Sequence, residues 1–201
     1  EKIVRRRRGG FCYELNGLFA ALLRELGFPV TLLSARVRDG DTFGPEFDHL
    51  ILLVQLEERW LADVGFGDWA LWPLRLDRPG EQIQEGRAFR ILRHSDEWEA
   101  QELSADGIVA DGYQFTVHPR QLEDFAAMCR TQQTSPDSGF TQKRIITLPT
   151  LDGRVTLSGP AGGPATEMRL IVTAHGEKTE RAVESEGEYA ALLRGHFGVT
   201  L

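Results

Sequence analysis

The hydrophobic pattern changes its period at Pro29, and this change most restricts the folds that the chain can adopt. Before Pro29, apolar residues recur every three or four positions through "CYELNGLFAALLREL", which predicts one amphipathic helix over 12–26. Its predicted buried stripe consists of Leu15, Leu18, Phe19, Leu22, Leu23 and Leu26. Gly27 is placed to end the helix, and Pro29 prevents its continuation. After Pro29, short β-branched and apolar segments predict mainly strands.

Six strands separated by short polar links are predicted in the first two thirds of the chain. They cover 30–37, 49–56, 59–66, 87–93, 98–103 and 113–117. The link Glu57-Glu58 between the second and third is typical of a hairpin. Consecutive strands joined in this way indicate an antiparallel sheet or a small barrel.

The remaining segments are predicted to add helices and two hairpins. Pro119 is placed at the first position of a helix over 119–131, and 132–140 has the composition of a loop. Hairpins are predicted to turn at 151–153 and at 175–178, followed by a helix over 188–198. This order of elements indicates a mixed α+β chain without the repeated βαβ units of a doubly wound fold.

The charge balance and the few cysteines exclude several classes of protein. A net charge of −7 over 201 residues argues against binding to nucleic acid or to an anionic membrane surface. Two cysteines do not form a disulfide framework, and no apolar run reaches the roughly 20 residues of a membrane span. The start "EKIVRRRRGG" has no apolar core of a signal peptide. We therefore expect a cytoplasmic protein with free thiols.

Cys12 is the first candidate for chemistry because it is predicted to begin the first helix. Free backbone N–H groups and the helix dipole at that position favour a thiolate. Gly9 and Gly10 allow a sharp turn before it. A cysteine at a helix start is also common as a packing residue. Cys129 shares the apolar face of its predicted helix with Leu122 and Phe125, so we expect a structural role for it.

A thiolate nucleophile needs a base, and His49 is the best placed of the five histidines. His49 begins the most hydrophobic predicted strand, although a buried structural histidine would fit the same position. The others lie in predicted turns, helix edges or polar links and are expected to be exposed: His94, His118, His175 and His196.

Asp63 is the candidate carboxylate that would orient the imidazole. It interrupts the apolar strand "WLADVGF", where an unpaired charge is costly to bury. A hairpin of 49–56 with 59–66 would bring His49 close to Phe66 and Asp63 within reach. Asp63 is then expected to accept a hydrogen bond from the Nδ1–H of His49. Rival carboxylates are Glu14, Asp48 and Asp68.

Three segments are distinctive when taken together: "RRGGFCYELNGLF", "FDHLILLV" and "WLADVGFGD". They resemble the arylamine N-acetyltransferase family, and the later segment "YQFTVHPRQLEDFAAMCRTQQTSPDSGF" is similar to that family as well. The resemblance implies three parts: residues 1–29 as the remaining piece of an N-terminal helical domain, 30–131 as a β-barrel domain with a following helix, and 132–201 as a C-terminal α/β lid. It also implies that a longer helical segment precedes Cys12 in the family.

The resemblance implies a chemistry and a set of site residues. The triad would be Cys12, His49 and Asp63, with Asn16, Gly65 and Phe66 lining the substrate site. Acetyl-CoA would be the co-substrate, without a permanently bound cofactor, and an arylamine or arylhydrazine would accept the acetyl group through an acetyl-cysteine thioester. No ligand spacing for a metal and no Walker-type phosphate loop is present.

Alternative functions use the same three residue types. An amide synthase acting on a polyketide-type substrate would share the family's motifs. A thiol hydrolase would need the same nucleophile, base and acid. A truncated and inactive family member that only binds CoA or a partner is a third alternative. The pattern predicts neither the acceptor amine nor the oligomeric state.

Overall fold

The computed structural model describes residues 1–201, the whole chain. The chain forms two compact units, one of Gly10–Cys129 and the other of Glu1–Gly9 together with Arg130–Leu201. Each unit has its own sheet and its own hydrophobic core. The three-part division at 29/30 and 131/132 stays a prediction.

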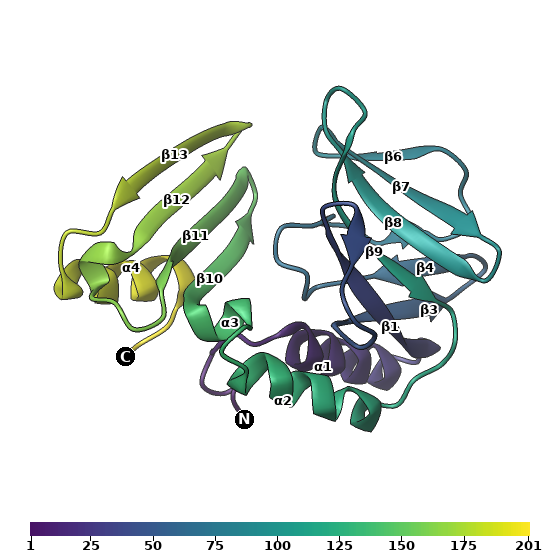
Figure 1. The fold of residues 1–201 in the computed structure, drawn as a ribbon, viewed down its shortest axis with the longest axis horizontal. Helices are drawn as coiled ribbons and strands as arrows, with labels where there is room; N and C mark the ends of the chain where they lie inside the picture. The colour runs from purple at the N-terminus through teal and green to yellow at the C-terminus, as the bar shows by residue number, and fades with distance from the viewer. The chain divides into compact units, whose positions relative to one another are not determined.

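The larger unit is built around a nine-stranded antiparallel sheet in the order β5-β4-β3-β1-β9-β8-β7-β6, with β2 paired to β1. Its strands are β1 (Val30–Asp39), β2 (Thr42–Phe43), β3 (His49–Gln55), β4 (Arg59–Ala62), β5 (Leu74–Arg75), β6 (Glu81–Gln84), β7 (Arg87–His94), β8 (Glu97–Leu103) and β9 (Val109–Thr116). The sheet curls into a nearly closed barrel (Figure 1). The predicted antiparallel barrel and the mixed α+β class are therefore confirmed.

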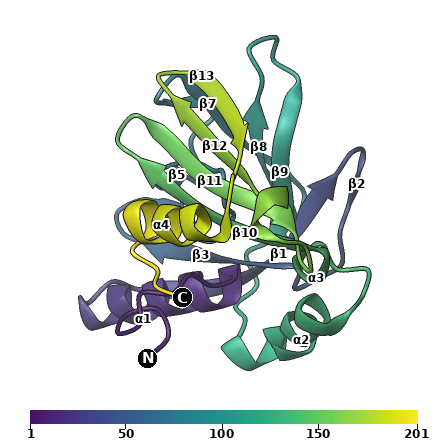
Figure 2. The same cartoon turned by 90° about the vertical axis from the view of Figure 1, so that its left-hand side faces the viewer.

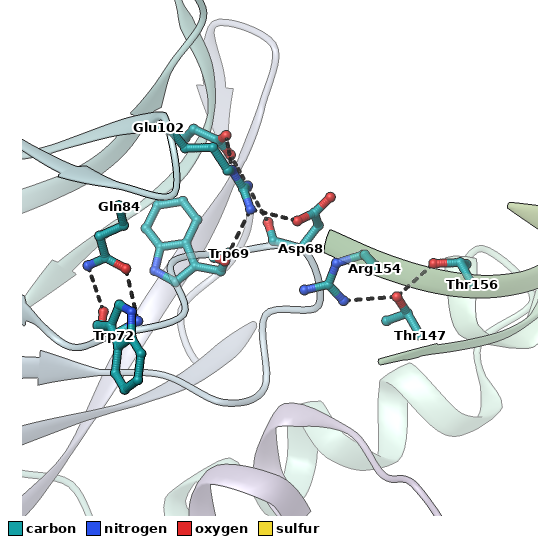
Figure 3. A network of polar contacts seen from close by, with 9 residues as sticks. Asp68, Trp69, Trp72, Gln84, Glu102, Thr147, Arg154 and Thr156 are labelled. Atoms are coloured by element: carbon teal, nitrogen blue, oxygen red, sulfur yellow. Dashed lines mark hydrogen bonds and ion pairs between the residues drawn. The ribbon is translucent and has the colours of Figure 1, made fainter. Parts of the chain in front are cut away.

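Two glutamine side chains link the strands at the ends of this path, β5 and β6. The Gln82 amide accepts from the Arg75 N–H at 2.8 Å and donates to the Arg75 carbonyl at 2.9 Å. Gln84 makes the same pair of contacts with the backbone of Trp72, each at 2.9 Å (Figure 3). Side-chain amides thus satisfy backbone groups that an open sheet edge would leave unpaired.

Strand β3 is buried on both faces, which explains its continuous apolar run. Ile51 and Leu53 belong to the cluster inside the barrel. Leu50 and Leu52 belong to a second cluster that includes Cys12 and other residues of the first helix. Because successive side chains of a strand point to opposite faces, β3 separates the barrel interior from the helix.

The first helix, α1 (Cys12–Glu25), confirms the predicted element, and its predicted buried face is right in part. Phe19 and Leu23 of the expected stripe are partly buried against the apolar cluster that includes Cys12, and Leu15 is partly buried as well. The buried residues are Cys12, Tyr13, Asn16 and Ala20. Three leucines of the expected stripe are exposed: Leu18 (39%), Leu22 (52%) and Leu26 (64%). Residues 12, 16 and 20 follow one row along the helix, and the buried Asn16 has polar partners on β3 and in the loop after β4. The face with Cys12, Asn16 and Ala20 is buried because the Asn16 amide finds hydrogen-bond partners there and the small Ala20 allows close packing.

Two predicted boundaries differ from the structure. Strand β4 ends at Ala62, so Asp63 lies in the loop after the strand and not within it. The helix expected from Pro119 begins at Leu122 as a short 3-10 turn, η1 (Leu122–Phe125). Asp124 accepts from the Gln121 N–H at 2.8 Å and caps this start. The backbone at Arg120 instead pairs with Leu32 of β1.

Helix α2 (Ala126–Thr134) continues into the segment predicted as a loop, and α3 (Gly139–Gln142) begins within it. Only the central residues 135–138 of that segment lie outside helices. The Ser138 hydroxyl caps α3 by accepting from the Phe140 N–H. Capping by Ser138 thus begins a short helix in a segment whose composition predicts a loop.

The smaller unit contains a four-stranded antiparallel sheet in chain order: β10 (Lys143–Thr150), β11 (Gly153–Pro160), β12 (Arg169–Ala174) and β13 (Glu177–Ala182). Both predicted hairpins are confirmed. Helix α4 (Glu186–Phe197) covers one face of this sheet (Figures 1 and 2), and η2 (Ala165–Glu167) joins β11 to β12. No helix of the chain has both the length and the apolar character to cross a membrane.

Candidate active site

The three predicted triad residues come from three elements of the larger unit. Cys12 is the first residue of α1, His49 is the first residue of β3, and Asp63 directly follows β4. Cys12 is 9% exposed, and the side chains of His49 and Asp63 are 4% and 1% exposed. Three polar side chains far apart in sequence are thus removed from water together.

His49 and Asp63 form a close buried pair. The His49 Nε2 lies 2.7 Å from the Asp63 Oδ2. The expectation that Nδ1 would face the carboxylate is therefore wrong. His49 is the first residue of β3, and from there its Nε2 is directed at Asp63 in the loop after β4. Nδ1 is the ring nitrogen that remains for another partner.

In this pair, each side chain stabilises the charged form of the other. Burial acts to lower the pKa of His49, but the Asp63 charge, its hydrogen bond and a hydrogen bond with Cys12 together raise that pKa to about 10. Burial acts to raise the pKa of Asp63, but His49, Asn16 and the Gly65 N–H hold it below its ordinary value. The imidazole between the Asp63 carboxylate and the Cys12 sulfur is thus protonated at neutral pH.

Asn16 connects α1 to both of the other elements. Its amide nitrogen donates to the Leu50 carbonyl at 2.7 Å and to the Asp63 Oδ1 at 2.8 Å. Its amide oxygen accepts from the Val64 N–H at 2.9 Å. The side chain is fully buried. These contacts hold Asp63 in place, while a contact of Asn16 with substrate stays a prediction.

Gly65 is required by the close approach of its backbone to Cys12. A Cβ at Gly65 would lie 2.6 Å from the Cys12 Cα and 2.8 Å from the Asn16 Nδ2. The Gly65 N–H donates to the Asp63 Oδ1 at 2.8 Å. Any side chain here would push the loop away from the thiol, so the "DVGFG" segment needs glycine at this position.

Aromatic rings surround the imidazole on the barrel side. Phe66 packs edge-on against His49 with ring centroids 5.2 Å apart, and it contacts Trp69 at 5.0 Å. Tyr113 lies 5.4 Å from the His49 ring. Burial and then the charge of Asp63 raise the pKa of Tyr113 well above its ordinary value, so its hydroxyl stays neutral.

The sequence does not predict Trp69 and Tyr113 as neighbours of the site. Both are buried aromatic residues of the barrel core, and nothing in their local sequence distinguishes them from ordinary core residues. Phe66 was predicted from its position across the hairpin from His49. Its place beside that ring agrees with this expectation, while its role toward substrate stays a prediction.

Two of the three rival carboxylates, Glu14 and Asp68, have other partners. Glu14 accepts from the Phe11 N–H at 3.2 Å at the start of α1. Asp68 pairs with Arg87, whose Nη1 lies 2.8 Å from the Asp68 Oδ1. Asp48 precedes His49, and its main-chain carbonyl, not its carboxylate, accepts from the Tyr13 hydroxyl at 3.0 Å. Asp63 is thus the carboxylate that contacts the imidazole.

The other predicted cysteine and histidine environments agree with the structure. Cys129 is partly buried and packs against the apolar cluster between α1 and β3. The remaining histidines are exposed: His94, His118, His175 and His196. The structure contains no group of three or more histidine, cysteine, aspartate or glutamate side chains that could hold a metal ion.

The buried pair should make stability depend on pH. Folding raises the pKa of His49 from 6.5 to about 10, so its contribution to stability is complete below about pH 6.5 and is lost as pH rises toward 10. We expect the free energy of unfolding in urea to fall more steeply between about pH 7 and pH 10 in the wild type than in His49→Gln. The excess slope should reach about 1.4 kcal/mol per pH unit. Equal slopes for the two proteins would contradict this pairing.

Comparison with known proteins assigns the family. The N-acetyltransferase family model matches residues 1–201. The arylamine N-acetyltransferase of Mycolicibacterium smegmatis is 37% identical over 209 residues, which cover 100% of this chain and 72% of that protein. The chain belongs to the arylamine N-acetyltransferase family. The pineal gland isozyme NAT-3 of Gallus gallus, another arylamine N-acetyltransferase, is 32% identical over 222 residues, covering 100% of this chain and 76% of that protein.

Solved arylamine N-acetyltransferase structures share the fold. The Mycobacterium marinum enzyme, solved in complex with CoA, superposes with a TM-score of 0.84 at 28% identity, covering 98% of this chain and 72% of that one. A Bacillus cereus enzyme described as having a Cys-His-Glu catalytic triad superposes with a TM-score of 0.84 at 26% identity, covering 100% of this chain and 78% of that one.

A relative with a different name is similar in sequence. Proansamycin X synthase of Amycolatopsis mediterranei is 33% identical over 189 residues, which cover 92% of this chain and 70% of that protein.

Proposed function

We propose that this chain transfers an acetyl group from acetyl-CoA to an arylamine or arylhydrazine through an acetyl-cysteine thioester. The observation that carries the proposal is the buried cluster of Cys12, His49 and Asp63 in a chain of this family. A solved relative in complex with CoA supports the donor, and the names of the relatives support the acceptor.

In the first half-reaction, Cys12 acts as the nucleophile. His49 holds the proton of the thiol, since Asp63 stabilises the imidazolium through Nε2 and leaves Nδ1 for the sulfur. The thiolate attacks the thioester carbonyl of acetyl-CoA. Backbone N–H groups at the start of α1, next to the sulfur, stabilise the oxyanion in this proposal. The carbon–sulfur bond to CoA then breaks, and His49 gives its proton to the leaving thiolate.

In the second half-reaction, the acceptor amine attacks the acetyl-Cys12 thioester. His49 takes the proton from the nitrogen, and the acetamide leaves as Cys12 is released. Thioester exchange between CoA and cysteine is nearly isoenergetic, so the acetyl group is stored without being trapped. The reaction needs a reduced thiol, which fits a cytoplasmic setting for the two free cysteines.

The aromatic residues beside His49 suit an aromatic acceptor. Phe66 is partly buried and packs against His49 and Trp69, so one ring face of an arylamine can stack in its neighbourhood. Apolar walls also disfavour water as a competing nucleophile. We propose Phe66 and Gly65 as the residues that line the acceptor site next to the thiol.

Intact-mass spectrometry with acetyl-CoA and no amine tests the mechanism. We expect the protein mass to increase by one acetyl group, located on Cys12 by peptide mapping. Addition of an arylamine should remove that group and produce one equivalent of acetamide. A folded protein in which Cys12 stays unmodified would contradict the proposal. Release of acetate at the same rate with and without amine would indicate a thiol hydrolase instead.

A second candidate is amide synthesis on a polyketide-type substrate. It is favoured by the similarity to Proansamycin X synthase over 92% of this chain. Both functions would use the same acyl-cysteine, so the acceptor and the acyl group separate them. Rapid acetylation from acetyl-CoA favours the first function. Acylation of Cys12 only by a long polyketide-type thioester would favour the second.

A further inference from the structure

The turn before His49 is held in an unfavourable backbone conformation. Phe47 has a φ of 66°, a region that bulky side chains rarely adopt. Its N–H donates to the Ser34 hydroxyl at 2.7 Å, and Ser34 is buried in β1. The Phe47 ring packs edge-on against Phe125 with centroids 5.2 Å apart. Such a conformation persists only where several surrounding contacts impose it.

A hydroxyl from α1 completes these contacts. The Tyr13 Oη lies 3.0 Å from the carbonyl oxygen of Phe47 and 3.0 Å from that of Asp48, so one proton is shared between two acceptors. Tyr13 is 6% exposed, and its ring contacts Phe125 at 6.0 Å. Burial first, and then nearby negative groups, raise its pKa, so the hydroxyl remains a donor at neutral pH.

The sequence positions of these groups connect the turn to the reaction. Tyr13 directly follows Cys12, and Asp48 directly precedes His49. Asn16, three residues further along α1, donates to the carbonyl of Leu50, the residue directly after His49. Because positions three apart share a helix face, two side chains of α1 hold the backbone on both sides of His49. Both come from the helix that presents the Cys12 sulfur.

We propose that Tyr13 is a positioning residue for acyl transfer, whose hydroxyl fixes the backbone before His49 at its working distance from Cys12. The role rests on the proposed function of the triad. Tyr13 touches neither the thiol nor the imidazole through this hydroxyl. Its effect is to set the relative position of two elements, α1 and β3, at the point where the nucleophile and the base meet.

Tyr13→Phe tests the proposal because it removes the hydroxyl and keeps the ring. We expect the maximal rate constant of Cys12 acetylation to fall on the order of ten-fold, with the half-saturating acetyl-CoA concentration unchanged. Tyr189→Phe makes the same chemical change in the core of the smaller unit and is the matched control. A wild-type maximal rate in folded Tyr13→Phe would overturn the proposal, as would an equal fall in Tyr189→Phe.

Ser34→Ala provides a second variant should Tyr13→Phe fail to fold. It removes the other polar contact of Phe47 and should lower the same rate constant in the same direction, by a smaller factor. A wild-type rate in that variant would then count against the proposal.

Alkylation of Cys12 by iodoacetamide at neutral pH tests the positioning role of Tyr13 separately from the proposed acetyl transfer, since alkylation needs no acetyl-CoA. With Cys129 as the internal reference, Tyr13→Phe should slow alkylation of Cys12 several-fold. An unchanged rate would overturn the positioning role. A wild-type protein that alkylates rapidly and is never acetylated would refute the acetyl transfer alone.

Discussion

Replacement of Cys12 by alanine is expected to abolish acetyl transfer, with a loss of at least about 10⁴-fold in kcat/KM. The estimate follows from other triads, in which loss of the nucleophile removes nearly all of the chemical acceleration. The measurement is steady-state acetylation of an arylamine, together with intact mass after incubation with acetyl-CoA. No acetyl group should remain on the variant protein.

Cys129→Ala is the matched control for this change. Cys129 is the other cysteine of the chain, is partly buried and packs against apolar side chains. We expect near wild-type turnover and a normal acetyl adduct on Cys12. Retention of substantial activity in Cys12→Ala, or loss of the adduct in Cys129→Ala, would mean that the nucleophile has been assigned to the wrong residue.

Asp63→Asn is expected to cost about 10⁴-fold in kcat at neutral pH. The asparagine can keep the contacts to Asn16 and Gly65, but it removes the charge that raises the pKa of His49. A neutral imidazole lacks the charge that stabilises the thiolate of Cys12 in the proposed mechanism. The decrease should therefore appear in the acetylation half-reaction, measured by single-turnover mass spectrometry.

Asp63→Glu keeps the negative charge and serves as the comparison. A relative from Bacillus cereus, 26% identical to this chain, is described as having a glutamate in its triad. We expect Asp63→Glu to retain more activity than Asp63→Asn, although the longer side chain must fit a pocket in which Asp63 is 1% exposed. Activity of Asp63→Asn within ten-fold of the wild type would exclude the carboxylate from this role.

The types of the long elements were predictable because they depend on local patterns. The period of about 3.6 before Pro29 and the β-branched runs after it predicted α1 and most of the strands of both sheets. The short strands β2, β5 and β6 were missed, since two to four residues carry too little periodic signal. Cap geometry at Gln121 likewise moved one helix start from the predicted Pro119 to Leu122, and the cap at Ser138 begins a short helix in a segment predicted as a loop.

The candidate site was predictable in its members and not in its geometry. Cys12 at a helix start, His49 at the head of an apolar strand and Asp63 in apolar surroundings each carried a local signal. The ring nitrogen that faces Asp63 depends on how β3 meets the loop after β4, which no local pattern contains. Trp69 and Tyr113 beside the imidazole also depend on contacts between distant strands.

By itself, the sequence predicted the longer helix and strand segments, the members of the candidate triad and the resemblance to the family. Tertiary structure alone decided which face of α1 is buried, how Gln82 and Gln84 join the barrel edges, and how Tyr13 and Asn16 bracket His49. The physical reason is that periodicity shows which side chains share a face, whereas the partner of that face lies elsewhere in the chain. Burial of Asn16 instead of three leucines follows from polar partners that only the folded chain brings together.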